Sequence, residues 1–255
     1  MNLQLPSHAI HQYRSASQRA RVSTEPWAEE NLYCPSCDSR HIDPLPAGTR
    51  AADFVCPSCA SRFQLKSKKG EIGNRVMDGA YSAMRDAIKS DNTPNLFLLH
   101  YQLPQFSVLN VLLIPHFAFS LSLLEKRKPL SSTARRSGWV GCNFLLDRIP
   151  ADARIPVVSA GRVIPPAQVR QAYQKVRPLE KLSVKKRGWT LDVLNVVRSL
   201  GKSDFHLSDV YAHADALAQL HPNNRHVRDK IRQQLQVLRD LRLLHFLGDG
   251  SYRLP

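Results

Sequence analysis

The sequence lacks a long apolar segment, an internal repeat and a low-complexity tract. Its longest largely apolar run, Val108–Pro115, is too short to cross a bilayer. It has neither a lipidation motif nor an amphipathic anchor, and its first residues lack the apolar core of a signal peptide. We therefore expect a cytoplasmic protein with no membrane partner.

Acidic residues are also scarce. The chain carries 21 Asp and Glu against 36 Lys and Arg, which gives a net charge of +15. This excess favours a polyanionic partner, because Lys and Arg displace the counterions that condense on phosphates. The 255 residues are enough for one large domain or two modest ones, and 43% of them are hydrophobic and can fill a core.

The spacing of apolar residues predicts a mixed α/β arrangement in the first part of the chain. We expect part of residues 1–30 to be helical, a helix over 75–90, buried strands over 96–101 and 108–115, a loop over 126–143, a strand or hairpin over 154–164 that turns at Gly161, and a linker over 165–186.

Beyond Gly188 the pattern becomes helical. We expect helices over 190–200, 207–220 (with Ser208 as its cap) and 224–243, then a small hairpin over 244–254. Three helices and a terminal hairpin are typical of a winged helix-turn-helix. Residues 181–255 hold 13 basic and 7 acidic residues, a balance of 13 − 7 = +6. We therefore predict two domains, residues 1–180 and residues 181–255.

Four of the five cysteines form two matching knuckles. Cys34 and Cys37 make one C-x-x-C pair, Cys56 and Cys59 make the other, and eighteen residues separate the pairs. Two such turns let four thiolates close a tetrahedron around Zn²⁺, and this spacing is typical of zinc ribbons. A zinc ion held by four cysteines has no open position, so we expect its role to be structural. The remaining Cys142 is interpreted as a small core residue.

An acid and a lysine suggest a nuclease site. Asp53 opens a short apolar stretch, and ten residues separate it from Gln64, which together with Lys66 flanks Leu65. Strand alternation puts Gln64 and Lys66 on one face. Metal-dependent phosphodiesterases use an acid, a neighbouring ligand and a lysine in this way, with Mg²⁺ to polarise the phosphate and acidify a water. Taken alone the pattern is weak, and a solvated acid beside a lysine-rich strand explains it as well.

The chain resembles the DpnI, or Dam-replacing, family of methyl-directed restriction endonucleases over nearly its whole length. The resemblance includes both cysteine knuckles and the segments Ser17–Arg21, Thr24–Trp27, Ala52–Phe54, Leu65–Gly70, Asp78–Tyr81, Arg127–Leu130, Thr133–Arg136, Gly138–Trp139, Gly141–Asn143, Arg187–Thr190 and Lys230–Gln236.

The resemblance implies a PD-(D/E)xK-type nuclease core with the four-cysteine zinc site, at residues 34–59, inserted into it, followed by a winged helix-turn-helix domain. It also implies cleavage of double-stranded DNA at GATC when the adenine is methylated. Asp53 and Lys66 map to the catalytic acid and lysine, and Leu65 would offer its carbonyl to Mg²⁺. Gln64 departs from the family, which carries glutamate there. An amide oxygen can still bind Mg²⁺ but brings one negative charge fewer, so weaker metal binding is expected. Glu25 is either a further acid of the metal site or an ordinary helix residue.

Two surfaces are candidates for reading the DNA. In the basic loop, Arg135 and Arg136 can hold phosphates or guanine, and Trp139 suits a methylated amine, although it could equally be a core aromatic. In the last helix the arginines suit guanine or phosphate and the glutamines suit adenine. The residues of that second surface are Arg225, Arg228, Arg232, Gln233 and Gln236. A solvated polar helix face explains them equally well without the resemblance.

The first interpretation is a type II restriction endonuclease that requires methylated adenine and acts as a monomer, with catalytic Mg²⁺ and structural Zn²⁺. The second is a methyl-DNA-binding regulator whose nuclease site is disabled at Gln64. The third is a GATC nuclease that ignores methylation. Magnesium-dependent cutting of methylated and unmethylated DNA distinguishes the three.

Overall fold

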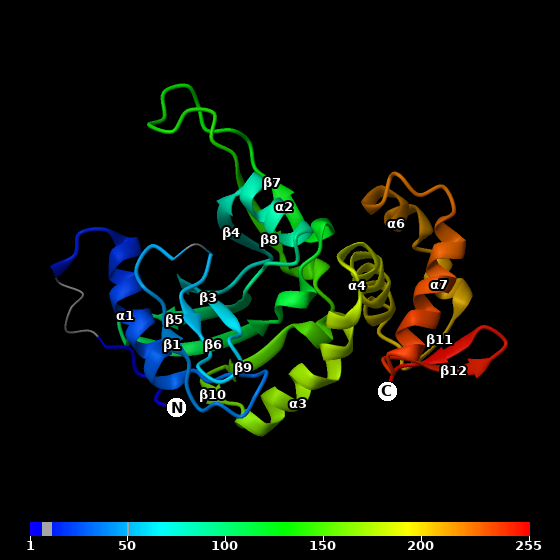
Figure 1. Cartoon of the computed structure of the whole chain (residues 1–255), viewed down its shortest axis with the longest axis horizontal. Helices are drawn as coiled ribbons and strands as arrows, with labels where there is room; N and C mark the ends of the chain where they lie inside the picture. The colour runs from blue at the N-terminus through cyan, green and yellow to red at the C-terminus, as the bar shows by residue number, and fades with distance from the viewer. Residues whose placement is uncertain (7–11, 50) are drawn as a thin grey trace. The chain divides into compact units, whose positions relative to one another are not determined.

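The chain folds into two compact units (Figure 1). The computed structural model describes residues 1–6, 12–49 and 51–255. The first unit draws on residues 1–73, 93–116 and 153–174, and the second on residues 74–92, 117–152 and 175–255. Each unit therefore combines separate stretches of the chain. The predicted division into residues 1–180 and 181–255 stays a prediction.

A seven-stranded sheet forms the body of the first unit. Its strands run in the order β1 (Asp43–Pro44), β2 (Phe54–Val55), β3 (Arg62–Lys69), β5 (Asn95–Gln102), β6 (Ser107–Ile114), β9 (Ile155–Ser159) and β10 (Arg162–Val163). Only β3 and β5 pair in parallel. Strand β5 is buried over seven of its eight residues, as expected of an apolar strand with neighbours on both sides. The two predicted buried strands and the hairpin that turns at Gly161 are confirmed.

Strand β3 is held by a polar contact to helix α1 (Ala16–Asn31) and by an apolar contact to strand β5. Helix α1 contacts β3, where the Thr24 hydroxyl lies 3.1 Å from that of Ser67. The rings of Phe63 and Phe97 stack with centroids 5.5 Å apart, and burying each is worth about 2 kcal/mol. These contacts fix β3, the strand that carries the predicted catalytic lysine.

The linker predicted over 165–186 is wrong. Residues Pro166–Val176 form helix α3, followed by a 3-10 helix, η6 (Arg177–Lys181). Proline suits the first helical turn, and Val169, Tyr173 and Val176 are buried at helical spacing. The buried Tyr173 hydroxyl donates to the side-chain oxygen of Asn95 in β5 at 3.1 Å, so α3 as far as Gln174 belongs to the first unit, and its last two residues belong to the second.

A small sheet opens the second unit. Its strands run in the order β4 (Arg75–Ala80), β8 (Gly141–Leu145) and β7 (Leu124–Lys126), and helix α2 (Tyr81–Lys89) follows β4. The helix predicted over 75–90 is therefore wrong for its first six residues, which pair with β8 and include the poor helix former Gly79. The predicted loop is right for residues 127–140, and its ends are strand residues. Cys142 is fully buried, as predicted.

Four helices and a three-stranded sheet form the C-terminal part of the second unit. They are α4 (Val184–Ser199), α5 (Leu207–Tyr211), α6 (Ala214–Leu220) and α7 (Val227–Asp240), with strands β11 (Asp204–His206), β13 (Ser251–Arg253) and β12 (His245–Gly248) in that order. Further 3-10 helices of this unit are η2 (His116–Ala118, which begins at the unit boundary), η3 (Leu121–Leu123), η4 (Leu146–Arg148) and η5 (Ala151–Ala153, which ends beyond it).

This part is the predicted helix-turn-helix with its hairpin, with three corrections. The second predicted helix is split into α5 and α6, and strand β11 was not predicted. Ser208 is not the cap: the His206 side chain accepts the Ser208 N–H, and the Asp209 carboxylate accepts the His206 N–H. This reciprocal arrangement satisfies the first backbone donors of α5 with a histidine, a residue seldom found in that role.

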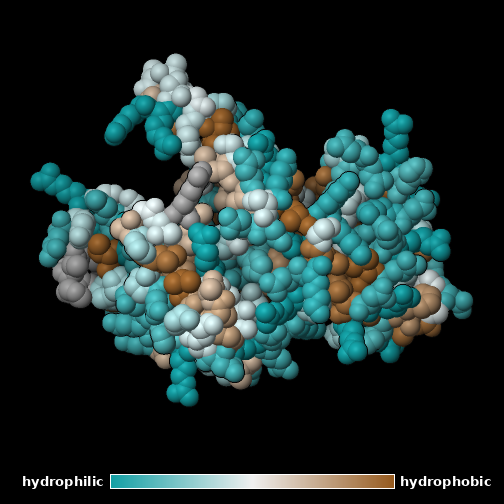
Figure 2. All heavy atoms as spheres, viewed as in Figure 1, coloured by the Kyte–Doolittle hydropathy of each residue, from teal (hydrophilic) through white to brown (hydrophobic). Residues whose placement is uncertain are grey.

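Hydrophilic side chains cover most of the surface visible in Figure 2, with smaller hydrophobic areas between them. Within the described part of the chain, no helix combines the length and the apolar character needed to cross a membrane.

Candidate functional site

Asp53 directly precedes β2 and lies against β3. Its N–H donates to the Phe63 carbonyl at 2.8 Å, and its Oδ2 accepts the Leu65 N–H at 2.7 Å. In a strand the N–H and C=O of one residue point to the same edge. The Leu65 carbonyl is therefore directed to the edge at which the Asp53 carboxylate is held.

Gln64 lies between the two residues of β3 that Asp53 contacts. Asp53 directly precedes β2, whose Phe54 pairs with Phe63, and it bonds to the Phe63 carbonyl through its N–H and to the Leu65 N–H through its carboxylate. Gln64 and Lys66 share a face of β3 by alternation, and both are half-buried. Among groups of three or more described His, Cys, Asp and Glu residues, only the four knuckle cysteines gather closely enough to hold an ion. Asp53 belongs to no such group among the described residues, and its neighbour Gln64 brings an amide in place of a carboxylate.

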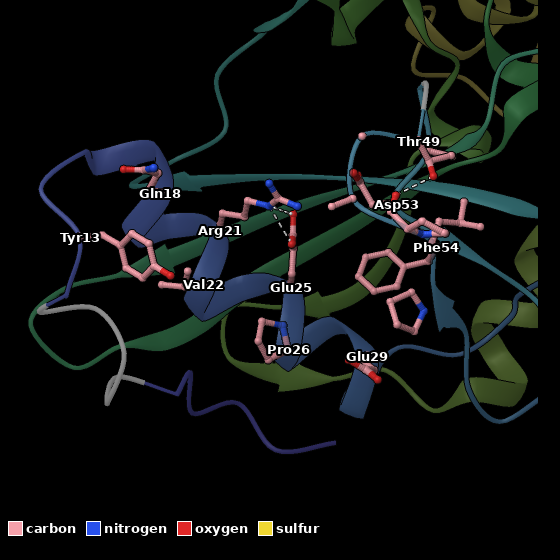
Figure 3. A pocket seen from close by; sticks show the side chains of 16 residues that line it. Tyr13, Gln18, Arg21, Val22, Glu25, Pro26, Glu29, Thr49, Asp53 and Phe54 are labelled. Carbon is pink, nitrogen blue, oxygen red and sulfur yellow. Dashed lines mark hydrogen bonds and ion pairs between the residues drawn. The ribbon is translucent and has the colours of Figure 1, made fainter.

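Asp53 lines a hollow of about 490 Å³ in the first unit (Figure 3). From α1, Arg21 extends toward Asp53, and its Nε lies 2.8 Å from the Glu25 carboxylate. The hydrogen bond and charge of Glu25 raise the pKa of Arg21, and the charge of Asp53 adds to the effect. Gln64 and Lys66 are not among the described residues that line this hollow. The hollow therefore joins Asp53 to three charged side chains of α1, Arg21, Glu25 and Glu29, and leaves Gln64 and Lys66 outside.

The four knuckle cysteines come together as predicted. Their sulfur atoms all lie within 4.8 Å of one another, with Cys34 3.6 Å from Cys59 and Cys37 3.5 Å from Cys56. A tetrahedral zinc with Zn–S bonds of ~2.3 Å requires sulfur separations of about 3.8 Å, so the cluster could hold zinc. The knuckles have matching backbones, because the N–H groups of Cys34 and Cys56 each donate to the carbonyl five residues later.

The thiols of the cluster differ in their surroundings. Burial raises the pKa of Cys34. Burial, the largest influence, also raises that of Cys56, but the N–H groups of Cys59 and Ser58 outweigh it and bring the Cys56 pKa down to about 7. Zinc must displace the remaining protons, since only thiolates are good ligands, and its binding therefore depends on pH.

Arg170 of α3 holds the first knuckle. Its guanidinium donates to the carbonyls of Cys34, Cys37 and Ser39 at 3.1, 2.9 and 2.8 Å. It also lies 5.2 Å from the centre of the Tyr33 ring. Sequence patterns do not predict this role, because the linker expected over 165–186 covers α3 and a single arginine has no spacing signal.

The basic loop between β7 and β8 extends away from its sheet (Figure 1). Arg135 and Arg136 are exposed, and the Arg136 guanidinium lies 5.0 Å from the centre of the Trp139 ring. Trp139 is half-buried and so is not a core aromatic. Its ring packs on Gly141, where an added Cβ would lie 2.8 Å from the indole. The structure thus presents two cations and one aromatic edge on a single loop.

The predicted DNA-reading face of α7 is exposed. The side of the helix formed by Ile231, Leu235 and Leu238 is buried. The predicted contacts are all exposed: Arg225, Arg228, Arg232, Gln233 and Gln236. The helix begins at Val227, later than predicted, so Arg225 lies just before α7 and the other four lie on it. Lys230 lies among them and is half-buried; burial lowers its pKa, and the nearby charges of Lys185 and Lys186 lower it further. A cluster of lysines at the end of a basic helix face suits phosphate oxygens.

Comparison with known families matches both parts of the chain. A model described as the Dam-replacing family matches residues 1–182, and one described as the Dam-replacing HTH domain matches residues 185–254. The first alone covers well over half of the sequence, and it implies a nuclease; the second implies DNA binding. Together with the mixed sheet, the helix-turn-helix and the cysteine cluster, these matches show that the chain belongs to the Dam-replacing family.

Proposed function

We propose that this protein is a restriction endonuclease that cleaves both strands of DNA at GATC sites carrying methylated adenine, by magnesium-dependent hydrolysis. The observation that carries the proposal is the position of Asp53, which bonds to Phe63 and Leu65 of β3, the residues on either side of Gln64. Family membership supports a methyl-directed restriction endonuclease. The magnesium-dependent hydrolysis and the GATC target sequence are the parts that we propose.

The residues of this chain would divide the catalytic work. Asp53, the Gln64 amide oxygen and the Leu65 carbonyl are the hard oxygen ligands that Mg²⁺ prefers. When bound, Mg²⁺ would neutralise phosphate charge and acidify a water. Lys66 shares the face of Gln64 and would orient the attacking water and balance charge at the phosphate.

Glu25 is proposed as a further acid of this site. It faces the same hollow as Asp53 and is only half-exposed (Figure 3). Its present partner is Arg21, an exposed cation that could instead pair with a DNA phosphate. Release of Glu25 by that exchange would add one negative charge near Asp53, where Gln64 contributes none.

Two readers are proposed for the methylated site, one in each predicted domain. A buried methyl group contributes only about 1 kcal/mol, so strong discrimination needs more than one contact. The loop with Arg135, Arg136 and Trp139 supplies the first reader, and the exposed face of α7 the second. The bounds of the matched families, 1–182 and 185–254, support domains over residues 1–180 and 181–255. We propose that the protein acts as a monomer.

Parallel digestion tests the proposal. The protein is incubated with fully methylated and unmethylated plasmid of one sequence, each with Mg²⁺ and with EDTA. Cutting only of the methylated plasmid, and only with Mg²⁺, is expected. Binding of methylated DNA without cutting at any Mg²⁺ concentration would favour the regulator, and equal cutting of both plasmids would favour a methylation-indifferent nuclease.

A further inference from the structure

The side-chain oxygen of Gln233 is occupied within the protein. The Lys230 ammonium lies 2.6 Å from Gln233 Oε1 and donates to it. A lysine ammonium has only donors, so the Gln233 atom facing it must be the carbonyl oxygen rather than the amide nitrogen. This contact fixes which way the amide of an exposed glutamine is turned.

A second donor to the same oxygen comes from the core. Gln234 is fully buried, and its Nε2 donates to Gln233 Oε1 at 3.3 Å. The Oε1 of Gln234 accepts the hydroxyl of Thr190 in α4, also fully buried, at 2.8 Å. The chain of contacts from Thr190 to Gln234 to Gln233 is therefore anchored in the interior and reinforces the orientation that Lys230 imposes.

An amide oxygen has two lone pairs, and in Gln233 both now have donors. What the exposed end of Gln233 can still offer a ligand is its NH₂ group. The side chain therefore acts as a hydrogen-bond donor and lacks the donor-plus-acceptor character with which glutamine normally reads adenine.

Methylation removes from adenine the major-groove donor that a glutamine without a free acceptor could not use. In the major groove an unmodified adenine presents an acceptor at N7 and a donor at N6. N6-methyladenine keeps a single N6 hydrogen, which pairs with thymine in the duplex, and the methyl group takes the groove position. The groove donor is lost while N7 remains. A glutamine that both donates and accepts favours unmodified adenine, whereas one that only donates has no such preference.

We infer that Lys230 is a specificity-determining residue: by occupying the carbonyl oxygen of Gln233 it restricts Gln233 to donating to purine N7 and withholds the contact that would favour unmethylated adenine. Lys230 is thus a positioning residue that acts through Gln233. The inference rests on the proposed function, since it assumes that α7 reads a methylated GATC site. On this inference, part of the methyl preference of α7 arises because unmethylated adenine cannot donate a hydrogen bond from N6 to Gln233.

The test measures the full chain binding to methylated and unmethylated GATC duplexes by fluorescence anisotropy, without divalent metal and at fixed salt. Lys230→Met should lower the ratio of methylated to unmethylated affinity about fivefold, because one hydrogen bond to the N6 donor becomes available to the unmethylated duplex. Lys230→Arg retains a donor and should keep the wild-type ratio. Lys185→Met removes an exposed charge near Lys230 without touching Gln233, and should weaken binding to both duplexes equally.

A double variant shows whether Lys230 acts through Gln233. In a Gln233→Ala background, Lys230→Met should leave the ratio unchanged. An unchanged ratio in Lys230→Met alone, or the same fall with and without Gln233, would overturn the inference while leaving the proposed function standing. Equal binding of both duplexes by the wild-type chain would instead count against methyl recognition itself.

Discussion

The Leu65 N–H donates a 2.7 Å hydrogen bond to the Asp53 carboxylate, so the acid of the proposed site is held by the backbone of the strand that carries Lys66. A carboxylate fixed in this way needs little reorganisation to receive a metal ion. Its contribution can be separated from that of Lys66 by substitution.

Loss of either Asp53 or Lys66 should abolish cutting but not binding. We expect Asp53→Asn and Lys66→Ala each to lower the rate of cleavage of methylated DNA by at least about a hundredfold, since one removes a metal ligand and the other the positioning of the water. Single-turnover cleavage and gel-shift binding check this. Wild-type rates in either variant would move the active site elsewhere.

Gln64 should weaken metal binding, and Gln64→Glu should therefore lower the Mg²⁺ concentration at half-maximal cutting, by about tenfold for a gain of roughly 1–2 kcal/mol. The added carboxylate would lie between Phe63 and Leu65, the two residues of β3 that bond to Asp53. Gln18→Glu adds the same charge at an exposed rim position of the hollow and controls for a general electrostatic effect. If Gln64→Glu does not change the Mg²⁺ concentration at half-maximal cutting, residue 64 does not contact the ion.

Glu25 and Glu29 make a matched pair on α1, because both line the hollow and lie one turn apart. Glu25 is half-buried and pairs with Arg21, whereas Glu29 is exposed. We expect Glu25→Gln to raise the Mg²⁺ requirement about tenfold and Glu29→Gln to leave it unchanged. Equal metal titrations for the two variants would make Glu25 an ordinary helix residue.

Much of the fold followed from apolar spacing, and the errors have local causes. The buried strands β5 and β6 were predictable because their apolar runs are continuous. The strand β4 was missed because its apolar residues also fit a helical period, and only pairing with β8 decides between the two. Helix α3 was missed because its proline, which in fact begins the helix, was interpreted as a breaker.

The candidate site shows a similar limit. The cysteine spacing alone predicted the cluster, since ligand number and turn geometry are encoded locally. Asp53 and Lys66 needed a family resemblance, because an acid and a lysine ten or more residues apart have no specific spacing. The hydrogen bonds of Arg170 to the first knuckle and the Lys230–Gln233 contact could not be predicted from the sequence, since each depends on side-chain directions that only the folded chain defines.

Zinc removal should destabilise the first unit, which contains the four knuckle cysteines. We expect about one zinc per chain in the purified protein, and Cys34→Ser should lower its zinc content and its thermal unfolding midpoint, because zinc binding is coupled to folding. Arg170→Ala should weaken zinc retention more modestly by releasing the knuckle carbonyls. Cys142→Ala lies outside the cluster and should keep its zinc. As pH falls, protons compete for the thiolates and zinc should be lost; elemental analysis after dialysis at each pH measures this, and a metal-free protein at neutral pH would refute the assignment.

The predicted C-terminal domain should retain methyl recognition when separated, at some cost in stability. Residues 181–255 keep the apolar contacts between α4 and α7, including the buried Leu194 and Leu235. They lose two carboxylates: Asp91, which pairs with the buried Arg187, and Asp152, which pairs with Arg198 at 2.5 Å. In the fragment both arginines can be hydrated, so we expect a lower unfolding midpoint with the fold kept. Circular dichroism during heating checks this before any binding measurement.

The folded fragment should then bind methylated GATC duplex more tightly than unmethylated duplex, with a ratio of roughly tenfold, because one helix face supplies few contacts to the methylated base. Its α7 face remains exposed, and the methyl group of methyladenine lies in the major groove that such a helix enters. Arg232→Ala and Gln233→Ala should each weaken binding more than Lys202→Ala, an exposed lysine outside α7. Fluorescence titration of the fragment against both duplexes at fixed salt gives these ratios. Equal affinity for the two duplexes in a fragment shown to be folded would assign methyl recognition to the loop that carries Trp139.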